Sequence, residues 1–150
     1  MRVALFQPDI AQNTASLIRL GACTGVGVDI VEPCGFLFSE SGFRRAGMDY
    51  LEMAQVTRHE SWSAYLTARG TGRIVLLTTK ASTSYIDFAF DAADTLLLGR
   101  ESAGVPQEVH GRADARLRIP LRPGLRSINV AQAGAMVLGE ALRQTDGFQA

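Results

Sequence analysis

The residues best placed to do chemistry lie in three loops, each of which follows a short apolar run. These loops are residues 77–80, residues 99–101 and the longer stretch 119–129. Ligands of open α/β sheets bind where parallel strands end, so we expect the three loops to meet. They are rich in main-chain donors and acceptors and poor in catalytic side chains, which suits recognition of an adenosine cofactor by main-chain contacts. Turn geometry alone also favours glycine, proline and serine at such positions.

Two glycine-rich stretches have the composition of nucleotide-binding loops but the wrong context. The stretch Gly21-Ala-Cys-Thr-Gly25-Val-Gly27 lies after an expected helix and before an expected strand, the reverse of a dinucleotide fingerprint. The stretch 99–104 has the glycine spacing of a phosphate-binding loop, but Val105 stands where that loop needs lysine. Neither stretch predicts binding of a dinucleotide or a nucleoside triphosphate.

The cysteines and histidines do not form a reactive site. Cys23 and Cys34 are too far apart for a Cys-x-x-Cys pair, and no second pair completes a zinc site. His59 and His110 show no metal-ligand spacing, and either one alone would have to supply a hydrolase triad. We therefore expect reduced structural thiols, structural or surface histidines and no metal.

Arginines concentrate near the C-terminus although the formal net charge of the chain is 0. Five arginines face a single acid, Asp114, in one short stretch: Arg112, Arg116, Arg118, Arg122 and Arg126. Guanidinium groups pair bidentately with phosphate, so this stretch is a candidate surface for nucleic acid. An arginine-rich solvated surface is the alternative interpretation.

The elements that must position the loops alternate along the chain. We predict strands at residues 2–6, 27–31, 73–79, 94–99 and 117–120, and helices between them. Asn13 or Thr14 is expected to cap the first helix and Gly25 to end it. A second helix is expected from Ser61 to residue 69, and a final one from about residue 128 to 145 with Ser127 as its cap. Residues 35–60 show only short turn and helix signals.

This alternation predicts an α/β fold in which a mainly parallel sheet carries helices on both faces, because near-continuous apolar strands must be covered twice. With 150 residues, 47% of them apolar, and no linker or repeat, residues 1–150 are expected to form a single domain.

The N-terminus does not resemble a signal peptide, and no apolar run approaches the ~20 residues of a membrane span. A cytoplasmic protein without a membrane partner is expected. Glycines 134 and 139 in the final helix indicate close backbone approach, either in a dimer interface or against the sheet.

Three motifs in order resemble the 2′-O-ribose branch of the SPOUT methyltransferases. They are Asn13-Thr14 followed by Arg19, then Gly99-x-Glu101-x-x-Gly104, then Ile119-Pro120 with Ser127-x-Asn129. Further segments are similar to one subgroup, minimal tRNA methyltransferases that modify the wobble nucleotide: Phe6-x-Pro8, Glu32-Pro33-x-Gly35-Phe36, Arg44-Arg45-Ala46-Gly47-x-Asp49-Tyr50, Val56-Thr57-Arg58-His59 and Leu77-Thr78-Thr79-Lys80. The resemblance covers nearly the whole chain.

The resemblance implies a SPOUT fold with a C-terminal trefoil knot, a homodimer, a tRNA partner and S-adenosylmethionine as cofactor, which would leave as S-adenosylhomocysteine. By motif position the cofactor pocket would be formed by Leu77, Thr78, Gly99, Glu101, Ile119, Leu121, Ser127 and Asn129. Arg19 would be the catalytic residue, and Asn13 would position it or the substrate. Arg44, Arg45 and Tyr50 would contact RNA or the partner subunit.

The implied reaction is 2′-O-methylation of the wobble cytidine or uridine of tRNA. Three alternatives stay open from the sequence. They are the same reaction on another RNA such as ribosomal RNA, a dimeric RNA-binding protein that has kept the fold without turnover, and a plain nucleotide-binding α/β module.

Overall fold

The computed structural model describes residues 1–39, 41–42 and 50–149 of the chain. Arg44 and Arg45, expected to contact RNA or a partner subunit, lie outside the described residues.

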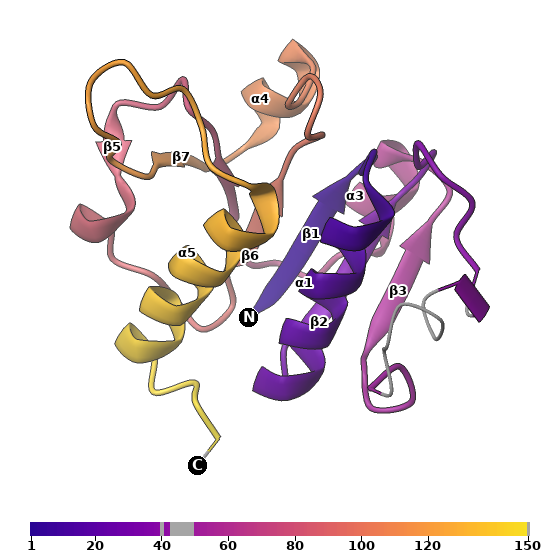
Figure 1. Ribbon diagram of the computed structural model, residues 1–150. Helices are drawn as coiled ribbons and strands as arrows, with labels where there is room; N and C mark the ends of the chain where they lie inside the picture. Colours follow the sequence, from indigo (N-terminus) through magenta and orange to yellow (C-terminus); the bar gives the residue numbers. More distant parts are fainter. Residues whose placement is uncertain (40, 43–49, 150) are drawn as a thin grey trace.

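A seven-stranded sheet runs through the molecule, and all the strand pairings in the described part of the chain are parallel. The strand order is β3-β2-β1-β6-β4-β7-β5 (Figure 1). The strands are β1 (Arg2–Phe6), β2 (Gly27–Val31), β3 (Val56–His59), β4 (Ile74–Leu77), β5 (Thr83–Ser84), β6 (Thr95–Leu98) and β7 (Ala115–Arg118). The parallel sheet predicted from the sequence is confirmed.

Helices cover both faces of this sheet, as predicted. They are α1 (Ala11–Thr24), α3 (Trp62–Ala68), α4 (Gln107–Arg112) and α5 (Val130–Gln144), with a short 3-10 helix, η1, at Tyr85–Asp87. Helices α1 and α5 lie side by side on one face (Figure 1). Helices α3 and α4 pack on the other face, where Trp62, Tyr65 and Val109 are buried.

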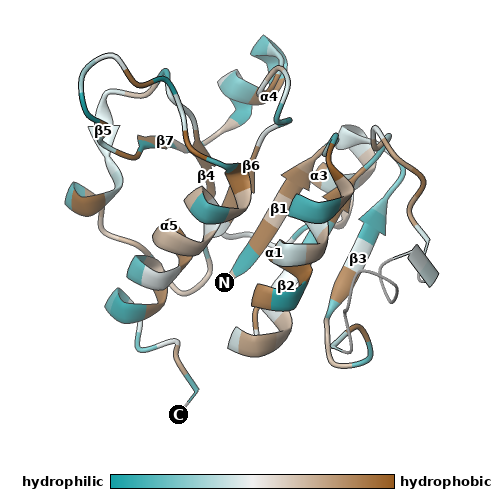
Figure 2. Ribbon diagram, viewed as in Figure 1, coloured by the Kyte–Doolittle hydropathy of each residue, from teal (hydrophilic) through white to brown (hydrophobic). Residues whose placement is uncertain are grey.

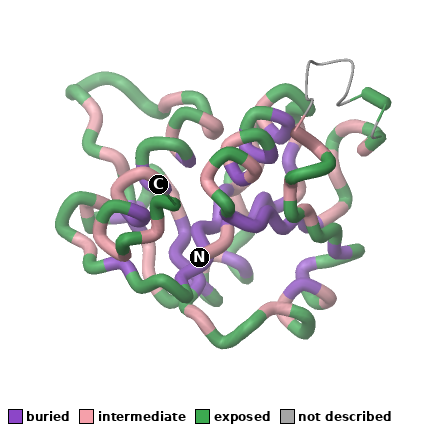
Figure 3. Tube along the Cα trace, turned by 90° about the horizontal axis from the view of Figure 1, so that it is seen from below, coloured by how far each residue is buried: buried purple, intermediate pink, exposed green. Residues whose placement is uncertain are grey.

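The strands bury their side chains on both sides, which produces two cores. Along β1, Val3 and Leu5 belong to the core under α1 and α5, whereas Ala4 and Phe6 belong to the core under α3 and α4. Figure 2 shows the apolar colouring along the central strands, and Figure 3 shows the buried backbone gathered in the middle of the molecule. This alternation follows from the two-residue period of a strand.

Helix α1 ends as the sequence predicts but begins differently. Gly25 adopts a left-handed conformation with φ of 70°, and its N–H donates to the carbonyl of Gly21. The expected cap at Asn13 or Thr14 is wrong, because the helix begins at Ala11 after Ile10, which makes no side-chain cap. The amide of Asn13 is therefore free for contacts outside its own helix.

Helix α5 begins two residues later than predicted. Asn129, not Ser127, is its cap, because Asn129 Oδ1 accepts from the N–H groups of Ala131 at 2.8 Å and Gln132 at 3.2 Å. A Cβ at Gly134 would lie 2.8 Å from Leu17 Cδ2, so this glycine serves tight packing against α1. A Cβ at Gly139 would meet nothing within 4 Å.

Several short elements were not predicted. Strand β3 is an edge strand with exposed Thr57 and Arg58, so it lacks an apolar run. Helix α4 buries only Val109, and β5 is two residues long. Strand β7 lies two residues earlier than expected. Helix α3 lies within the predicted range 61–69, and Ser61 is its cap, because Ser61 Oγ accepts from the Ala64 N–H at 3.0 Å.

Candidate functional site

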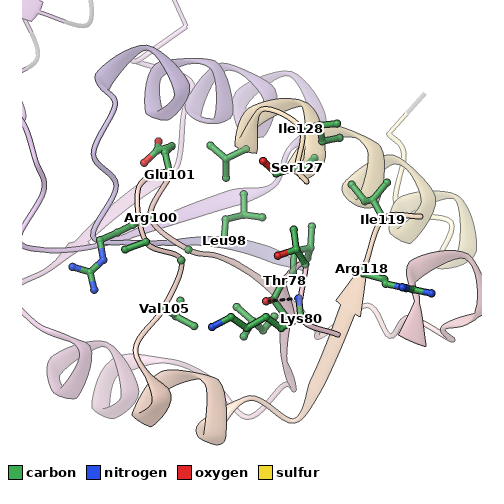
Figure 4. Close-up of a pocket in the computed structure, with 18 of the residues that line it drawn as sticks. Thr78, Lys80, Leu98, Arg100, Glu101, Val105, Arg118, Ile119, Ser127 and Ile128 are labelled. Atoms are coloured by element: carbon green, nitrogen blue, oxygen red, sulfur yellow. Dashed lines mark hydrogen bonds between the residues drawn. The ribbon is translucent and has the colours of Figure 1, made fainter. Parts of the chain in front are cut away.

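A pocket of about 610 Å³ lies where β4, β6 and β7 end. Its walls come from the loops after these three strands and from the start of α5 (Figure 4). All the residues assigned to the cofactor pocket by motif position line it: Leu77, Thr78, Gly99, Glu101, Ile119, Leu121, Ser127 and Asn129. Asn13 of α1 lines it as well. The structure therefore brings together segments that are more than a hundred residues apart in the sequence.

The loop after β6 is a tight turn that only glycine permits at two positions. The N–H of Arg100 donates to the carbonyl of Gly104 at 3.0 Å, and the N–H of Gly104 donates back at 2.9 Å. Gly104 has φ of 62°, a conformation that favours glycine. A Cβ at Gly99 would lie 2.8 Å from the carbonyl carbon of Gly104. Gly99 thus allows the turn to fold back against the pocket wall.

Three polar side chains, one from each sequence motif, form a chain of hydrogen bonds beside the pocket. Asn129 Nδ2 donates to Asn13 Oδ1 at 2.9 Å, and Asn13 Nδ2 donates to Glu101 Oε1 at 3.4 Å. Asn129 Oδ1 is occupied by the first N–H groups of α5, so its amide has a defined orientation. Asn129 therefore orients Asn13, and Asn13 is the donor to the carboxylate of Glu101.

Arg19 lies elsewhere on the same helix. It is exposed, its guanidinium lies 4.7 Å from the centre of the Tyr50 ring, and it does not line the pocket. It lies six positions after Asn13, which is about 9 Å along the helix axis. The structure of the single chain brings Asn13 to the pocket but not Arg19.

The basic side chains at the pocket were not assigned to the cofactor site from the sequence. Lys80 follows β4, and its N–H donates to Thr78 Oγ1 at 3.2 Å. Arg100, Arg118 and His110 also line the pocket. Figure 4 shows the guanidinium groups of Arg100 and Arg118 directed away from its centre. Lys80 lies within a segment that the family resemblance includes, but nothing in its spacing assigns it a role.

The arginine cluster divides into two kinds of residue. Arg116 donates from Nε and Nη2 to the carbonyl oxygen of His110, at 2.9 and 2.6 Å, and so caps the end of α4. The other members are exposed on the surface: Arg112, Arg118, Arg122 and Arg126. The structure thus leaves four of these five arginines open to solvent.

His59 and Cys34 have structural environments, whereas Cys23 is exposed on the surface. His59 is buried, and its Nε2 lies 2.8 Å from Asp29 Oδ1, while Arg2 Nε donates to the other oxygen of Asp29 at 2.6 Å. Burial raises the pKa of Cys34 to about 11, so that thiol stays protonated. Within residues 1–39, 41–42 and 50–149, no three acidic, cysteine or histidine side chains gather as metal ligands. In the same residues, no helix has both the length and the apolar character needed to cross a membrane.

Comparison with known proteins agrees with this geometry. A protein of Ancylobacter novellus named tRNA (cytidine(34)-2'-O)-methyltransferase is 57% identical over 150 residues, which is 99% of this chain and 95% of the relative. A solved structure described as giving insights into the 2-OH methylation of C/U34 on tRNA superposes with a TM-score of 0.90 at 35% identity, covering 95% of this chain and 94% of the other.

A second solved structure carries a bound cofactor. It is an AdoMet-bound rRNA methyltransferase from Sinorhizobium meliloti, with a TM-score of 0.84 and 27% identity over 95% of this chain and 55% of the other. The sequence pattern of the SpoU rRNA Methylase family matches residues 1–139. The chain therefore belongs to the SpoU methylase family.

Proposed function

We propose that this chain transfers the methyl group of S-adenosylmethionine to the 2′-hydroxyl of a cytidine or uridine at position 34 of tRNA. The observation that carries the proposal is the hydrogen-bonded chain Asn129–Asn13–Glu101, because it joins all three sequence motifs at one pocket. The names of the Ancylobacter relative and of the C/U34 methylation structure support the same substrate position.

The pocket suits the proposed cofactor in size and chemistry. Its volume of about 610 Å³ lies within the range of roughly 300–1,000 Å³ that is typical of small-molecule sites. Leu77, Ile119 and Leu121 supply apolar walls, and the loops supply main-chain donors and acceptors. Glu101 supplies a negative charge, which favours a sulfonium cation. When bound, the cofactor supplies an electrophilic methyl carbon for an in-line displacement.

The protein's own task is to align the ribose and stabilise the charge that develops on its 2′-oxygen. Asn13 orients this edge of the pocket through Glu101 and Asn129. A guanidinium holds its proton strongly, so Arg19 is assigned to the phosphate beside the reacting ribose and to the developing alkoxide. The mechanism requires no metal.

A homodimer is part of the proposal, and it gives Arg19 a place in the site. Arg19 does not line the pocket of its own chain, so we assign it to the pocket of the second copy, across a twofold axis. The outer face of α5 supports such packing, since Ala135 is exposed and small, and Gly139 has open space beside it.

The proposal also includes a trefoil knot and a cytoplasmic location. The strand order supports the knot, because β6 lies between β1 and β4 although β4 precedes it in the chain. The loop 119–129 then leads into α5, which packs beside α1 and β6. The cytoplasm is supported by the tRNA substrate.

The exposed arginines are assigned to the RNA backbone. Arg112, Arg118, Arg122 and Arg126 lie near the pocket loops in the sequence, and Arg118 lines the pocket itself. Because guanidinium pairs with phosphate, these side chains would hold tRNA beside the pocket.

A test of this function uses purified protein, S-adenosylmethionine with a labelled methyl group, and separate pools of tRNA and ribosomal RNA. The account predicts label in tRNA only, and a ribose-methylation map that places it at nucleotide 34. Label in ribosomal RNA alone would move the substrate to the one named in the family description and in the Sinorhizobium structure. Absence of label in both pools would contradict the enzyme assignment.

A further inference from the structure

Asp9 occupies the turn between β1 and α1, next to the pocket but outside its lining. The turn begins at Gln7, which has φ of 44°, a conformation that non-glycine residues adopt only when their surroundings hold them there. The N–H of Gln7 donates to the carbonyl of Val31 at 2.8 Å, which fixes the turn to the end of β2. The path of the chain thus directs Asp9 toward the loop after β6.

Asp9 and that loop hold each other by hydrogen bonds in both directions. The N–H of Asp9 donates to Glu101 Oε2 at 2.8 Å. In return, Asp9 Oδ2 accepts from the N–H of Ser102 at 3.1 Å and from the Ser102 hydroxyl. These bonds to Ser102 lower the pKa of Asp9, so the carboxylate keeps its charge at neutral pH. We call this set of three bonds the Asp9 clasp.

The other side of Asp9 is braced by the segment after β2. The N–H of Gly35 donates to the carbonyl of Pro8 at 2.9 Å. A Cβ at Gly35 would lie 3.0 Å from Asp9 Cα and 3.2 Å from Asp9 Oδ1. The backbone of the 33–36 segment therefore packs directly against Asp9 and limits its movement away from the loop.

The clasp determines the direction of the Glu101 carboxylate. One oxygen, Oε2, receives the N–H of Asp9, and the other, Oε1, receives Asn13 Nδ2. Both oxygens are thus oriented, and Asn13 continues the chain to Asn129. Without the clasp, the loop 99–104 would have only its internal turn bonds and the side chain of Asn13 to place Glu101.

We infer that Asp9, together with Ser102, is a positioning residue for the proposed methyl transfer: it fixes the Glu101 carboxylate, and through it Asn13 and Asn129, at the edge of the pocket. This inference rests on the proposed function. It assigns a role to Asp9, which does not line the pocket, through its bonds to Ser102, which does. Asp9 acts through Glu101 and makes no contribution to the chemical step itself.

The test compares Asp9→Ala, Ser102→Ala and the double variant with two conservative variants, Asp9→Asn and Ser102→Thr. Loss of a hydrogen bond to a charged group changes a rate by about tenfold or more. We expect Asp9→Ala and Ser102→Ala each to lower kcat/KM for methyl transfer by about tenfold, and the double variant to lose no more than the worse single variant. Ser102→Thr keeps the hydroxyl and Asp9→Asn keeps an acceptor, so both should recover activity.

Asp91→Ala is the matched control. Asp91 Oδ1 accepts from the N–H of Ala93 at 2.8 Å in an exposed turn before β6, away from the pocket. The Asp91→Ala change removes a backbone-to-carboxylate bond of the same kind, so it should lower stability to urea and leave kcat/KM unchanged. Hydrogen exchange adds a readout that does not depend on turnover: the backbone amides of residue 9 and of Ser102 should exchange faster in Asp9→Ala than in the wild type, and should be unchanged in Asp91→Ala.

The possible results separate this inference from the proposed function. If the wild type methylates tRNA and Asp9→Ala retains its full kcat/KM, the positioning role is wrong while the function stands. A fall in kcat/KM that Asp91→Ala reproduces would show a general loss of stability and would also overturn the role. If the wild type transfers no methyl group, the proposed function fails and this role falls with it.

Discussion

At the scale of single residues, the amide of Asn13 decides how the edge of the pocket is arranged. Its Oδ1 accepts from Asn129, and its Nδ2 donates to Glu101, so each end of the amide has a different partner. An asparagine suits this position because it carries one donor group and one acceptor group. A carboxylate of the same shape would lack the donor.

Asn13→Asp therefore tests the hydrogen-bonded chain. The substitution places a second carboxylate against Glu101 Oε1, 3.4 Å from the present amide nitrogen, and removes the donor. A lost hydrogen bond to a charged group costs about 1.5–3 kcal/mol, so we expect kcat/KM for tRNA methylation to fall at least about tenfold.

Gln12→Glu is the control for this change. Gln12 is exposed in the same first turn of α1, so the variant adds the same charge at the same end of the helix without touching Glu101. It should keep wild-type activity. Equal losses in the two variants would mean that charge near α1, rather than the Asn13–Glu101 contact, affects the reaction.

The sequence predicts much of the site at this scale, and the structure shows why the rest was missed. Glu101 and Asn129 were assigned by motif position, and both line the pocket. The Asp9 clasp was not predicted, because Asp9 and Ser102 are 93 positions apart and neither belongs to a recognised spacing. The position of Arg19 relative to the pocket also depends on the rotation of α1, which its sequence pattern does not fix.

At the scale of elements, the pocket depends on the alignment of β4 with β6, whose ends carry two of its loops. The two strands are parallel neighbours, with Ile74 beside Thr95. Just before them, Gly72 lies against the backbone of Ala93: a Cβ at Gly72 would lie 1.7 Å from the carbonyl oxygen of Ala93. The absence of a side chain at Gly72 lets the strands start in this register.

Gly72→Ala should accordingly be destabilising, because backbone cannot move aside as a flexible side chain can. Overpacking typically costs about 1–3 kcal/mol, and we expect a loss of about 3 kcal/mol in the free energy of unfolding, measured by urea denaturation. Gly70→Ala is the matched control, since a Cβ there meets nothing within 4 Å. Similar stability of the two variants would contradict the proposed close approach.

The elements found from the sequence are those whose burial leaves a pattern. Strand β6 has four buried apolar or threonine positions, and it was predicted with nearly correct limits. Strand β3 at the edge and helix α4 with only Val109 buried were missed, because one-sided exposure removes the apolar run on which the prediction depends. Helix starts were misplaced because Asn13, Thr14 and Ser127 all have cap-type side chains although none of them caps a helix, whereas Asn129 caps α5.

At the scale of the whole molecule, the proposed site needs two chains. Each chain forms one such pocket. The Arg19 side chain of the same chain is exposed to solvent and does not line it. In a twofold dimer the same contact occurs twice, so the Arg19 of one copy can complete the pocket of the other. The resemblance implies a homodimer, but the sequence does not indicate from which copy each residue of the proposed site would come.

Mixing two inactive variants tests the shared site. Arg19→Ala removes the arginine, and Gly99→Val blocks the pocket loop, because Gly99 has backbone within 3 Å of its Cβ position. A mixed dimer would hold one intact site, built from the pocket of the Arg19→Ala chain and the arginine of the Gly99→Val chain. After subunit exchange at equal concentrations, we expect about a quarter of the wild-type methylation rate. No recovery in a mixture that sedimentation shows to be dimeric would place Arg19 within its own chain's site.

The account rests above all on one pocket, formed by the loops after β4, β6 and β7, that binds a methyl donor. Calorimetric titration of the purified protein with S-adenosylmethionine tests it most directly. We predict saturable binding with one site per chain, and loss of that binding in a folded Gly99→Val variant, whose cooperative urea unfolding serves as the control. Absence of binding heat in the wild type at several temperatures, or unchanged affinity in Gly99→Val, would contradict the account.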